Sequence, residues 1–232
     1  MRKTLLAMSL VGAFSLAGTA QAGAENVLIY EDLTLGVSAY QDAVAALGWS
    51  SFFTADAFTF ANELNTGSYT HVISAHQNSF AAAGFEDALS NWAQSNPGSP
   101  VLISDWRVNG PQPYLAELGF NYTGATNLSN LVGTDDGPLA GLSSPVVSPG
   151  WGIFSYGVGG EGADIVATTS PGGGGQPIVA QNGSWFFNGF LSDTLAGADA
   201  IDIIIAELTV PAPGALALLG LAGLTARRRR RD

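Results

Sequence analysis

Short apolar runs alternate with helical patterns over the first half of the chain. Apolar side chains are consecutive in the runs and recur every three or four positions between them, which predicts buried strands separated by helices. The predicted strands are residues 27–30, 51–54, 71–74 and 101–104, and the predicted helices are residues 40–47, 57–64 and 85–92. This alternation predicts a flavodoxin-like α/β fold, with a doubly wound parallel sheet and helices on both faces.

The pattern changes after Arg107, where Gly and Pro break the chain into shorter pieces. A short helix is predicted over residues 114–118, and short strands are predicted at residues 120–123, 128–133, 153–156 and 164–168. Asn182-Gly183 is a typical two-residue turn and predicts a hairpin on either side of it, residues 177–180 with 184–187. We therefore expect a β-rich C-terminal insertion, followed by a closing helix from Ser192 to Leu208.

The N-terminus has the pattern of a secretory signal peptide. Arg2 and Lys3 precede an apolar stretch over residues 5–16, and Ala20-Gln21-Ala22 supplies the small residues that signal peptidase requires. Residues 1–22 are therefore predicted to be removed on export. Residues 23–209 have the length of one domain with a sizeable core.

The C-terminal segment joins a Pro-containing motif, residues 210–214, to an apolar stretch, residues 215–226, and an Arg cluster, residues 227–231. A membrane holds such a cluster on its cytoplasmic side, so the domain is predicted to lie outside. As a helix, the apolar stretch would rise about 18 Å, against a hydrocarbon core of about 30 Å. This favours a transient anchor over two alternatives, a permanent short anchor and a buried core helix.

This three-part tail resembles the PEP-CTERM sorting signals of bacterial surface and matrix proteins. The resemblance implies processing by an exosortase-type protease at the membrane and a destination at the cell surface or in the extracellular matrix. Ala212 stands where the commonest form of the motif has Glu. The predicted sorting residues are Val210, Pro211, Pro213, Arg227, Arg228, Arg229, Arg230 and Arg231.

The exported segment is strongly acidic. Arg107 is the only Lys or Arg in residues 23–209, against 18 Asp and Glu residues, which gives this segment a formal charge of −17. Such a charge repels nucleic acids and is compatible with cations, neutral sugars or basic partners. The chain has no cysteine, which excludes disulfides, thiolate metal ligands and a cysteine nucleophile.

The element order, with Val101-Leu102-Ile103-Ser104-Asp105 and Asn188-Gly189-Phe190, resembles the class I glutamine amidotransferase-like fold, particularly its ThuA-like branch. The resemblance covers most of the exported segment. Amidotransferases of this fold carry a nucleophilic Cys just after the strand that matches residues 101–103, where this chain has Ser104-Asp105. Glutaminase chemistry is therefore not expected here, and no cofactor is expected.

Polar residues follow several of the predicted strands. Ligands of open α/β sheets bind at the carboxyl ends of the strands, so these residues are expected to meet at one rim. The catalytic candidates are His76, Asp105 and Arg107, and the ligand-binding candidates are Glu31, Asp32, Gln77, Asn78, Trp106 and Asn188. Asp193, near the last strand, is expected at the same rim. Trp106, together with Trp151, is also a candidate for an exposed sugar-stacking platform, although core packing explains most tryptophans.

Three interpretations of the rim remain open. Asp32, His76 and Asp105 could ligate a divalent cation, or His76 could act as a general base in an extracellular hydrolase that also uses Asp32, Asp105 and Arg107. Alternatively, the carboxylates cap nearby loops and Arg107 is their counter-ion. The sequence favours an exported, non-catalytic surface or matrix protein that binds a carbohydrate such as an extracellular polysaccharide, a cation or a matrix partner. The rivals are the hydrolase and a purely structural matrix component.

Overall fold

The computed structural model describes residues 25–34, 38–78, 84–147, 155–169 and 175–210. The predicted signal peptide, the sorting tail beyond Val210 and Trp151 lie outside these ranges. Within them, no helix has both the length and the apolar character needed to span a membrane.

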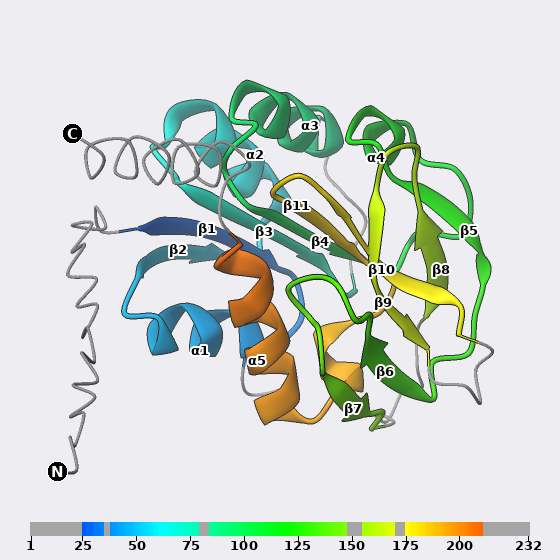
Figure 1. Cartoon of the computed structure of the whole chain (residues 1–232). Coiled ribbons are helices and arrows are strands. Elements are labelled where there is room, and N and C mark those ends of the chain that lie inside the picture. Colours follow the sequence, from blue (N-terminus) through cyan, green and yellow to red (C-terminus); the bar gives the residue numbers. More distant parts are fainter. Residues whose placement is uncertain (1–24, 35–37, 79–83, 148–154, 170–174, 211–232) are drawn as a thin grey trace, which may run out of the picture.

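One sheet organises the molecule (Figure 1). Its nine strands run in the order β2-β1-β3-β4-β11-β10-β9-β6-β7. Its parallel part comprises β2 (Ser50–Thr54), β1 (Asn26–Glu31), β3 (His71–His76), β4 (Val101–Asp105) and β11 (Trp185–Asn188). The inner strands β1, β3 and β4 are almost wholly buried, as their continuous apolar runs require. The predicted α/β fold with a parallel sheet is confirmed.

The β-rich segment extends the same sheet with antiparallel strands. These strands are β10 (Pro177–Asn182), β9 (Asp164–Thr169), β6 (Asn130–Gly133) and β7 (Ser143–Pro145). The predicted hairpin is confirmed as β10 and β11, and Gly183 in its turn has a φ of 61°, which glycine adopts without strain. The segment also forms a separate two-stranded sheet of β5 (Asn121–Ala125) and β8 (Tyr156–Gly159).

Helices cover both faces of the sheet (Figure 1). On one face, α1 (Ala39–Ala46) and α5 (Gly197–Leu208) pack together and contribute to one core cluster. The other face carries α2 (Ala57–Thr66), α3 (Phe85–Ser95) and α4 (Pro113–Glu117), which contribute to a second cluster. Ser38 and Asp56 cap α1 and α2, because their side chains accept hydrogen bonds from the Gln41 and Thr59 amides.

The closing helix begins later than the sequence predicts. Residues Ser192–Thr194 form a single 3-10 turn, η2, and α5 starts only at Gly197. Leu195 is extended and forms a β-bridge with Val146, so the backbone cannot continue as a helix through it. This interruption leaves η2 beside the carboxyl end of the sheet, where it becomes part of the candidate site.

Candidate ligand site at the carboxyl edge of the sheet

The parallel register brings the predicted rim residues to one edge. Glu31 pairs with Ala75, His76 with Asp105, and Asn188 with Ser104, at the ends of their strands. The expected convergence on one rim therefore occurs. The side chains nevertheless have different partners, and these partners divide the rim into two ends.

At the β4 end, Asp105 forms a closed ion pair with Arg107. One carboxylate oxygen accepts bonds from the Arg107 backbone amide at 3.0 Å and from Nε at 2.8 Å, and the other accepts bonds from Nη2 and, at 2.9 Å, from the Tyr114 hydroxyl. Arg107 also reaches Glu86, with 3.2 Å between Nη1 and Oε1. Tyr156 donates to the Asp105 carbonyl at 2.8 Å. Asp105 therefore acts here as the centre of a structural network.

His76 lies in an aromatic cluster. It is 1% exposed, with ring centroids 4.6 Å from Tyr30 and 4.5 Å from Phe85. Neither ring nitrogen has a hydrogen-bond partner among the residues described. Burial lowers the pKa of His76 to about 4, a direction that Arg107 reinforces and Asp105 opposes. The imidazole is therefore neutral at pH 7 and packs as an aromatic side chain, which gives little support to a role as general base.

Asp32 holds the loop that follows β3. Its carboxylate accepts hydrogen bonds from the backbone amides of Gln77 at 2.6 Å and Asn78 at 3.1 Å. The capping interpretation thus applies to Asp32, although it caps a neighbouring loop and not the segment that follows it. This bond also orients Gln77 at the rim.

The candidate cation site of Asp32, His76 and Asp105 is not formed. Across the described ranges, no group of three or more His, Cys, Asp or Glu residues is arranged to hold a metal ion. The physical reason is that each side chain is committed elsewhere: Asp32 to loop amides, Asp105 to Arg107 and His76 to the aromatic cluster. The interpretation of these three residues as the ligands of a divalent cation is therefore wrong for the described structure.

Two further predicted residues, Asn188 and Trp106, are not exposed at the rim. Asn188 is buried and donates to Glu207 on α5 at 3.2 Å, so it is not placed to contact a ligand. Burial raises the pKa of Glu207 to about 8, which leaves this carboxyl largely protonated near neutral pH. Trp106 is partly buried rather than presented as an exposed platform.

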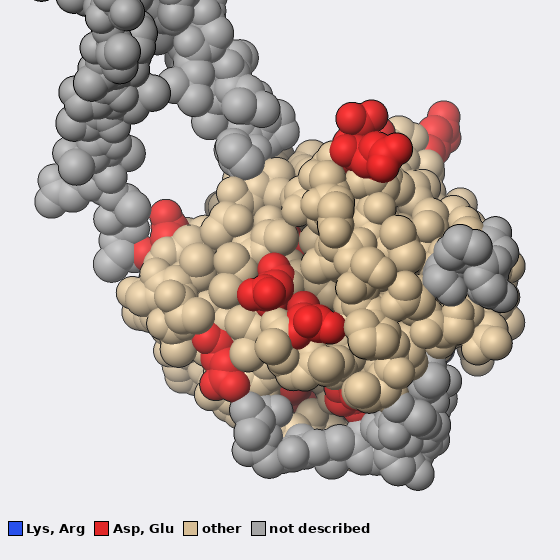
Figure 2. All heavy atoms as spheres, turned by 60° about the horizontal axis from the view of Figure 1, so that its bottom comes forward, with Lys and Arg blue, Asp and Glu red and all other residues tan. Residues whose placement is uncertain are grey.

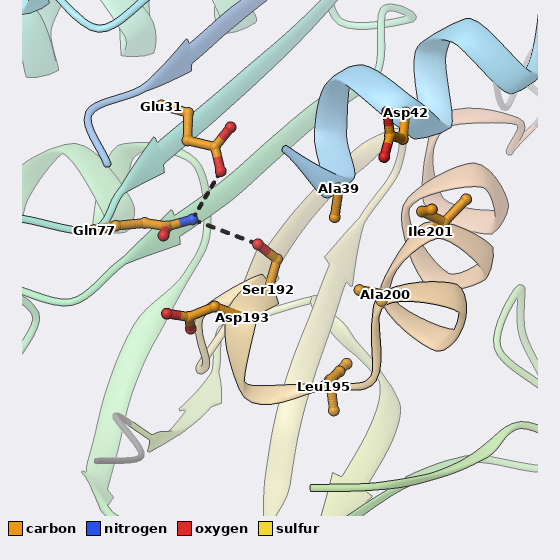
Figure 3. A pocket seen from close by; sticks show the side chains of 10 residues that line it. Glu31, Ala39, Asp42, Gln77, Ser192, Asp193, Leu195, Ala200 and Ile201 are labelled. Carbon is orange, nitrogen blue, oxygen red and sulfur yellow. Dashed lines mark hydrogen bonds between the residues drawn. The ribbon is translucent and has the colours of Figure 1, made fainter. Parts of the chain in front are cut away.

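At the β1 end, a small cavity opens between α1, η2 and α5 (Figure 3). Its volume is about 120 Å³. The side chain amide of Gln77 lies between Glu31 and Ser192 at one side of the cavity, and it donates to Glu31 Oε1 at 3.2 Å and to the Ser192 hydroxyl at 3.4 Å. The polar lining residues are Glu31, Asp42, Gln77, Ser192 and Asp193, and the rest of the lining is Ala39, Leu195, Gly197, Ala200 and Ile201.

Glu31 is the most buried carboxylate of this cavity. It is 3% exposed, and its Oε2 has no hydrogen-bond partner in the described part of the chain. Burial above all raises its pKa to about 7, with Asp32 and Asp193 adding to the rise and the Ser38 and Gln77 side chains opposing it. Of the rim residues predicted from sequence, Glu31, Gln77 and Asp193 line this cavity.

Sequence reasoning missed Ser192 and Asp42 as cavity-lining residues. Ser192 was placed in the first turn of a continuous helix, so its position in a separate turn beside Gln77 could not be seen. Asp42 looks like an ordinary exposed residue in the first turn of α1. The only available signal was the polar Ser192-Asp193 pair shortly after the last strand.

The comparisons with known proteins define the fold and no more. No protein family and no curated protein matches the sequence. Among solved structures, a putative GMP synthase subunit from Thermoplasma acidophilum superposes with a TM-score of 0.52 at 8% identity, covering 80% of this chain and 94% of that one. PurLQS from Thermotoga maritima gives a TM-score of 0.43 at 10% identity, covering 78% of this chain and 96% of that one.

The chain therefore has a glutamine amidotransferase-like fold, as its element order predicted. Identity this low transfers the architecture but no activity. The function has to be argued from the rim itself.

Proposed function

We propose that this chain is an exported protein, sorted through its C-terminal segment to the cell surface or extracellular matrix, whose α/β domain binds a ligand and has no catalytic activity. The terminal segments support the first part: a signal-peptide pattern in residues 1–22 and the PEP-CTERM-like tail in residues 210–232. Signal peptidase and an exosortase-type protease are the proposed processing partners, with transient membrane attachment through residues 215–226. The ThuA-like branch is the proposed relationship within the fold.

One observation carries the proposal of binding without catalysis. Ser104 and Asp105 stand where related enzymes carry their nucleophile, and both are engaged inside the protein. The Ser104 hydroxyl is buried and donates to the Phe190 carbonyl at 2.6 Å, while Asp105 is held by Arg107 and Tyr114. A nucleophile must reach the substrate and lie within hydrogen-bond distance of a base, and neither residue meets both conditions.

Intact-mass measurement on protein recovered from its native host tests the sorting proposal. We expect surface or matrix material that lacks both residues 1–22 and the Arg cluster of residues 227–231. Surface-bound protein that retains all five arginines would contradict processing of the tail, and cytosolic protein would contradict export.

A hydrolase screen tests the proposed lack of catalysis. Purified protein is assayed with ester, glycoside and peptide substrates, with Asp105→Asn as the matched variant. We expect no turnover above the buffer control. The rival hydrolase function would be established if the wild type turned over a substrate and Asp105→Asn did not, with circular dichroism showing that the variant keeps its fold.

A further inference from the structure

We propose that the cavity beside Glu31 binds a primary ammonium group carried on a short aliphatic chain. This inference rests on the proposed binding function and names its ligand class. The ammonium group would be held by the Glu31 carboxylate, and its aliphatic chain would lie against the apolar side of the cavity, formed by Ala39, Leu195, Ala200 and Ile201.

The buried carboxylate is the first argument. Glu31 is almost fully buried, one of its oxygens has no partner among the described residues, and it lines the cavity. Gln77 fixes its other oxygen at 3.2 Å, so the acceptor is already oriented (Figure 3). A buried carboxylate oxygen without a hydrogen-bond partner is costly, and a cationic donor to Oε2 would remove that cost.

The charge around the cavity is the second argument. Asp42 and Asp193 also line it, and Arg107, the only Lys or Arg described, is paired with Asp105. The face of the molecule shown in Figure 2 carries several acidic groups and shows no Lys or Arg. The N-termini of α1 and α5 each contribute a partial charge of about +0.5, which is less than the combined charge of the lining carboxylates. The cavity is therefore suited to a cation.

The shape and lining of the cavity favour an organic ammonium ion over a metal ion. The carboxylates of the described residues are not grouped closely enough to hold a metal ion. Ala39, Leu195, Ala200 and Ile201 give the cavity an apolar side. Its volume of about 120 Å³ is several times the roughly 10–15 Å³ that one water requires in a cavity, so it has room for more than a single small ion. An ammonium group with a short alkyl chain fits both the charge and the wall.

The protonation of Glu31 gives the site a pH signature. Its pKa is raised to about 7, so the carboxyl is partly protonated near neutral pH. The groups that face it are Asp32 after β1, Ser38 and Tyr40 at α1, Gln77 after β3, and Asp193 from η2. An ammonium ion favours the ionised carboxylate, so binding releases a proton and the affinity rises between pH 6 and pH 8.

Isothermal titration of the full-length chain tests this site. The probes are n-butylammonium chloride, the neutral n-butanol, calcium chloride, and a lysine amide with a blocked α-amino group. We expect n-butylammonium or the lysine derivative to saturate one site. Tighter binding of n-butylammonium would indicate that the natural ligand is a free amine, and tighter binding of the lysine derivative would indicate a lysine side chain of a partner. The neutral alcohol and calcium are expected not to bind there.

The variants are chosen so that charge alone cannot explain the result. Glu31→Gln keeps the shape of the side chain and should weaken n-butylammonium binding at least tenfold and abolish its pH dependence. Asp193→Asn should weaken it less. Asp164→Asn removes an equally charged, exposed residue on β9, away from the cavity, and should leave the affinity unchanged. Thermal unfolding of each variant checks that it folds.

Three results would overturn the inference: equal binding of n-butanol, equal losses in Glu31→Gln and Asp164→Asn, or calcium binding that depends on Glu31. Failure of every amine, with the hydrolase screen still negative, would refute the ligand class and leave the proposed function standing. Turnover of a substrate would refute the proposed function whether or not the amine binds.

Discussion

The two ends of the rim hold equally buried carboxylates in opposite circumstances. Asp105 is 2% exposed and Glu31 is 3% exposed. Asp105 is paired with Arg107 and accepts a further bond from Tyr114. Glu31 is hydrogen-bonded only by the neutral side chains of Ser38 and Gln77 among the described residues, and it faces the further carboxylates of Asp32 and Asp193. One end is closed by its own counter-ion, and the other has a cavity beside its carboxylate.

This difference explains why residue type alone could not separate structure from site. Both ends present acidic side chains at the ends of parallel strands, where ligand sites of this architecture occur. Arg107, the only Lys or Arg of residues 23–209, is used at the β4 end, so the β1 end has no Lys or Arg of its own. Removing charge should therefore have opposite effects on stability at the two ends.

The largest effect is expected from Arg107→Ala. It leaves Asp105 as a buried carboxylate without its counter-ion, which costs about 3–5 kcal/mol in the free energy of unfolding. Arg107→Lys should recover only part of this loss, because an ammonium group cannot reproduce the planar, two-point contact. Urea denaturation at pH 7 measures both variants. A loss under about 1 kcal/mol in Arg107→Ala, below the range for a buried pair, would contradict the structural role of this end.

Glu31→Gln should instead raise the free energy of unfolding, because it removes a buried carboxylate that has no counter-ion. The pKa of Glu31 is raised from 4.5 to about 7, so the folded protein binds this proton more tightly than the unfolded chain does. Its contribution to stability is therefore lost as the pH rises from about 4.5 to 7. We expect the free energy of unfolding of Glu31→Gln to exceed that of the wild type by on the order of 2 kcal/mol at pH 8. Near pH 4.5 the two proteins should differ little.

Denaturation curves at several pH values check this expectation. Glu207, whose pKa is also raised, affects the wild type and Glu31→Gln alike and so cancels in the difference. A variant less stable than the wild type at pH 8 would mean that the ionised Glu31 has a compensating partner. In that case both ends of the rim would have a compensated carboxylate, and the contrast between Asp105 and Glu31 would be lost.

Tyr114→Phe tests how much the β4 end depends on its hydroxyl donor. The variant keeps the buried ring and removes the bond of 2.9 Å to Asp105. A hydrogen bond to a charged group contributes about 1.5 kcal/mol or somewhat more, so a loss of this size is expected. Tyr156→Phe is the matched control, because its hydroxyl donates to the neutral carbonyl of the same residue and its loss should cost about 1 kcal/mol.

The parallel half of the fold could be predicted because its signals are local. Short continuous apolar runs such as Val27-Leu28-Ile29-Tyr30, alternating with helical patterns, are typical of buried parallel strands, and the turn at Asn182-Gly183 specifies its own hairpin. In contrast, Ser143-Ser144-Pro145 carries no apolar signal and becomes β7 only because β6 is available to pair with it. The break before α5 depends likewise on a distant contact, that of Leu195 with Val146.

The candidate site could be predicted only as a list of residues. Strand ends brought Glu31, Gln77 and Asp105 to one edge, because parallel register fixes where strands end. Which carboxylate has a counter-ion depends on side-chain direction and on the path of the chain after each strand, and the sequence pattern contains neither. The turn after β4 returns Arg107 to Asp105, and η2 brings Ser192 to Gln77.

The smallest expected effect comes from Glu86→Gln, which removes the second carboxylate that contacts Arg107. Glu86 lies 3.2 Å from Nη1 with its side chain 34% exposed, so water screens this ion pair and its loss should cost under about 1 kcal/mol. Raising the salt concentration should shrink the difference further, whereas the loss in Arg107→Ala should persist because the Asp105 pair is buried. Denaturation at low and high sodium chloride separates the two. If Glu86→Gln lost as much free energy of unfolding as Arg107→Ala, Arg107 would be held mainly by the exposed Glu86. The contrast between the two ends of the rim would then depend on Glu86 instead of Asp105.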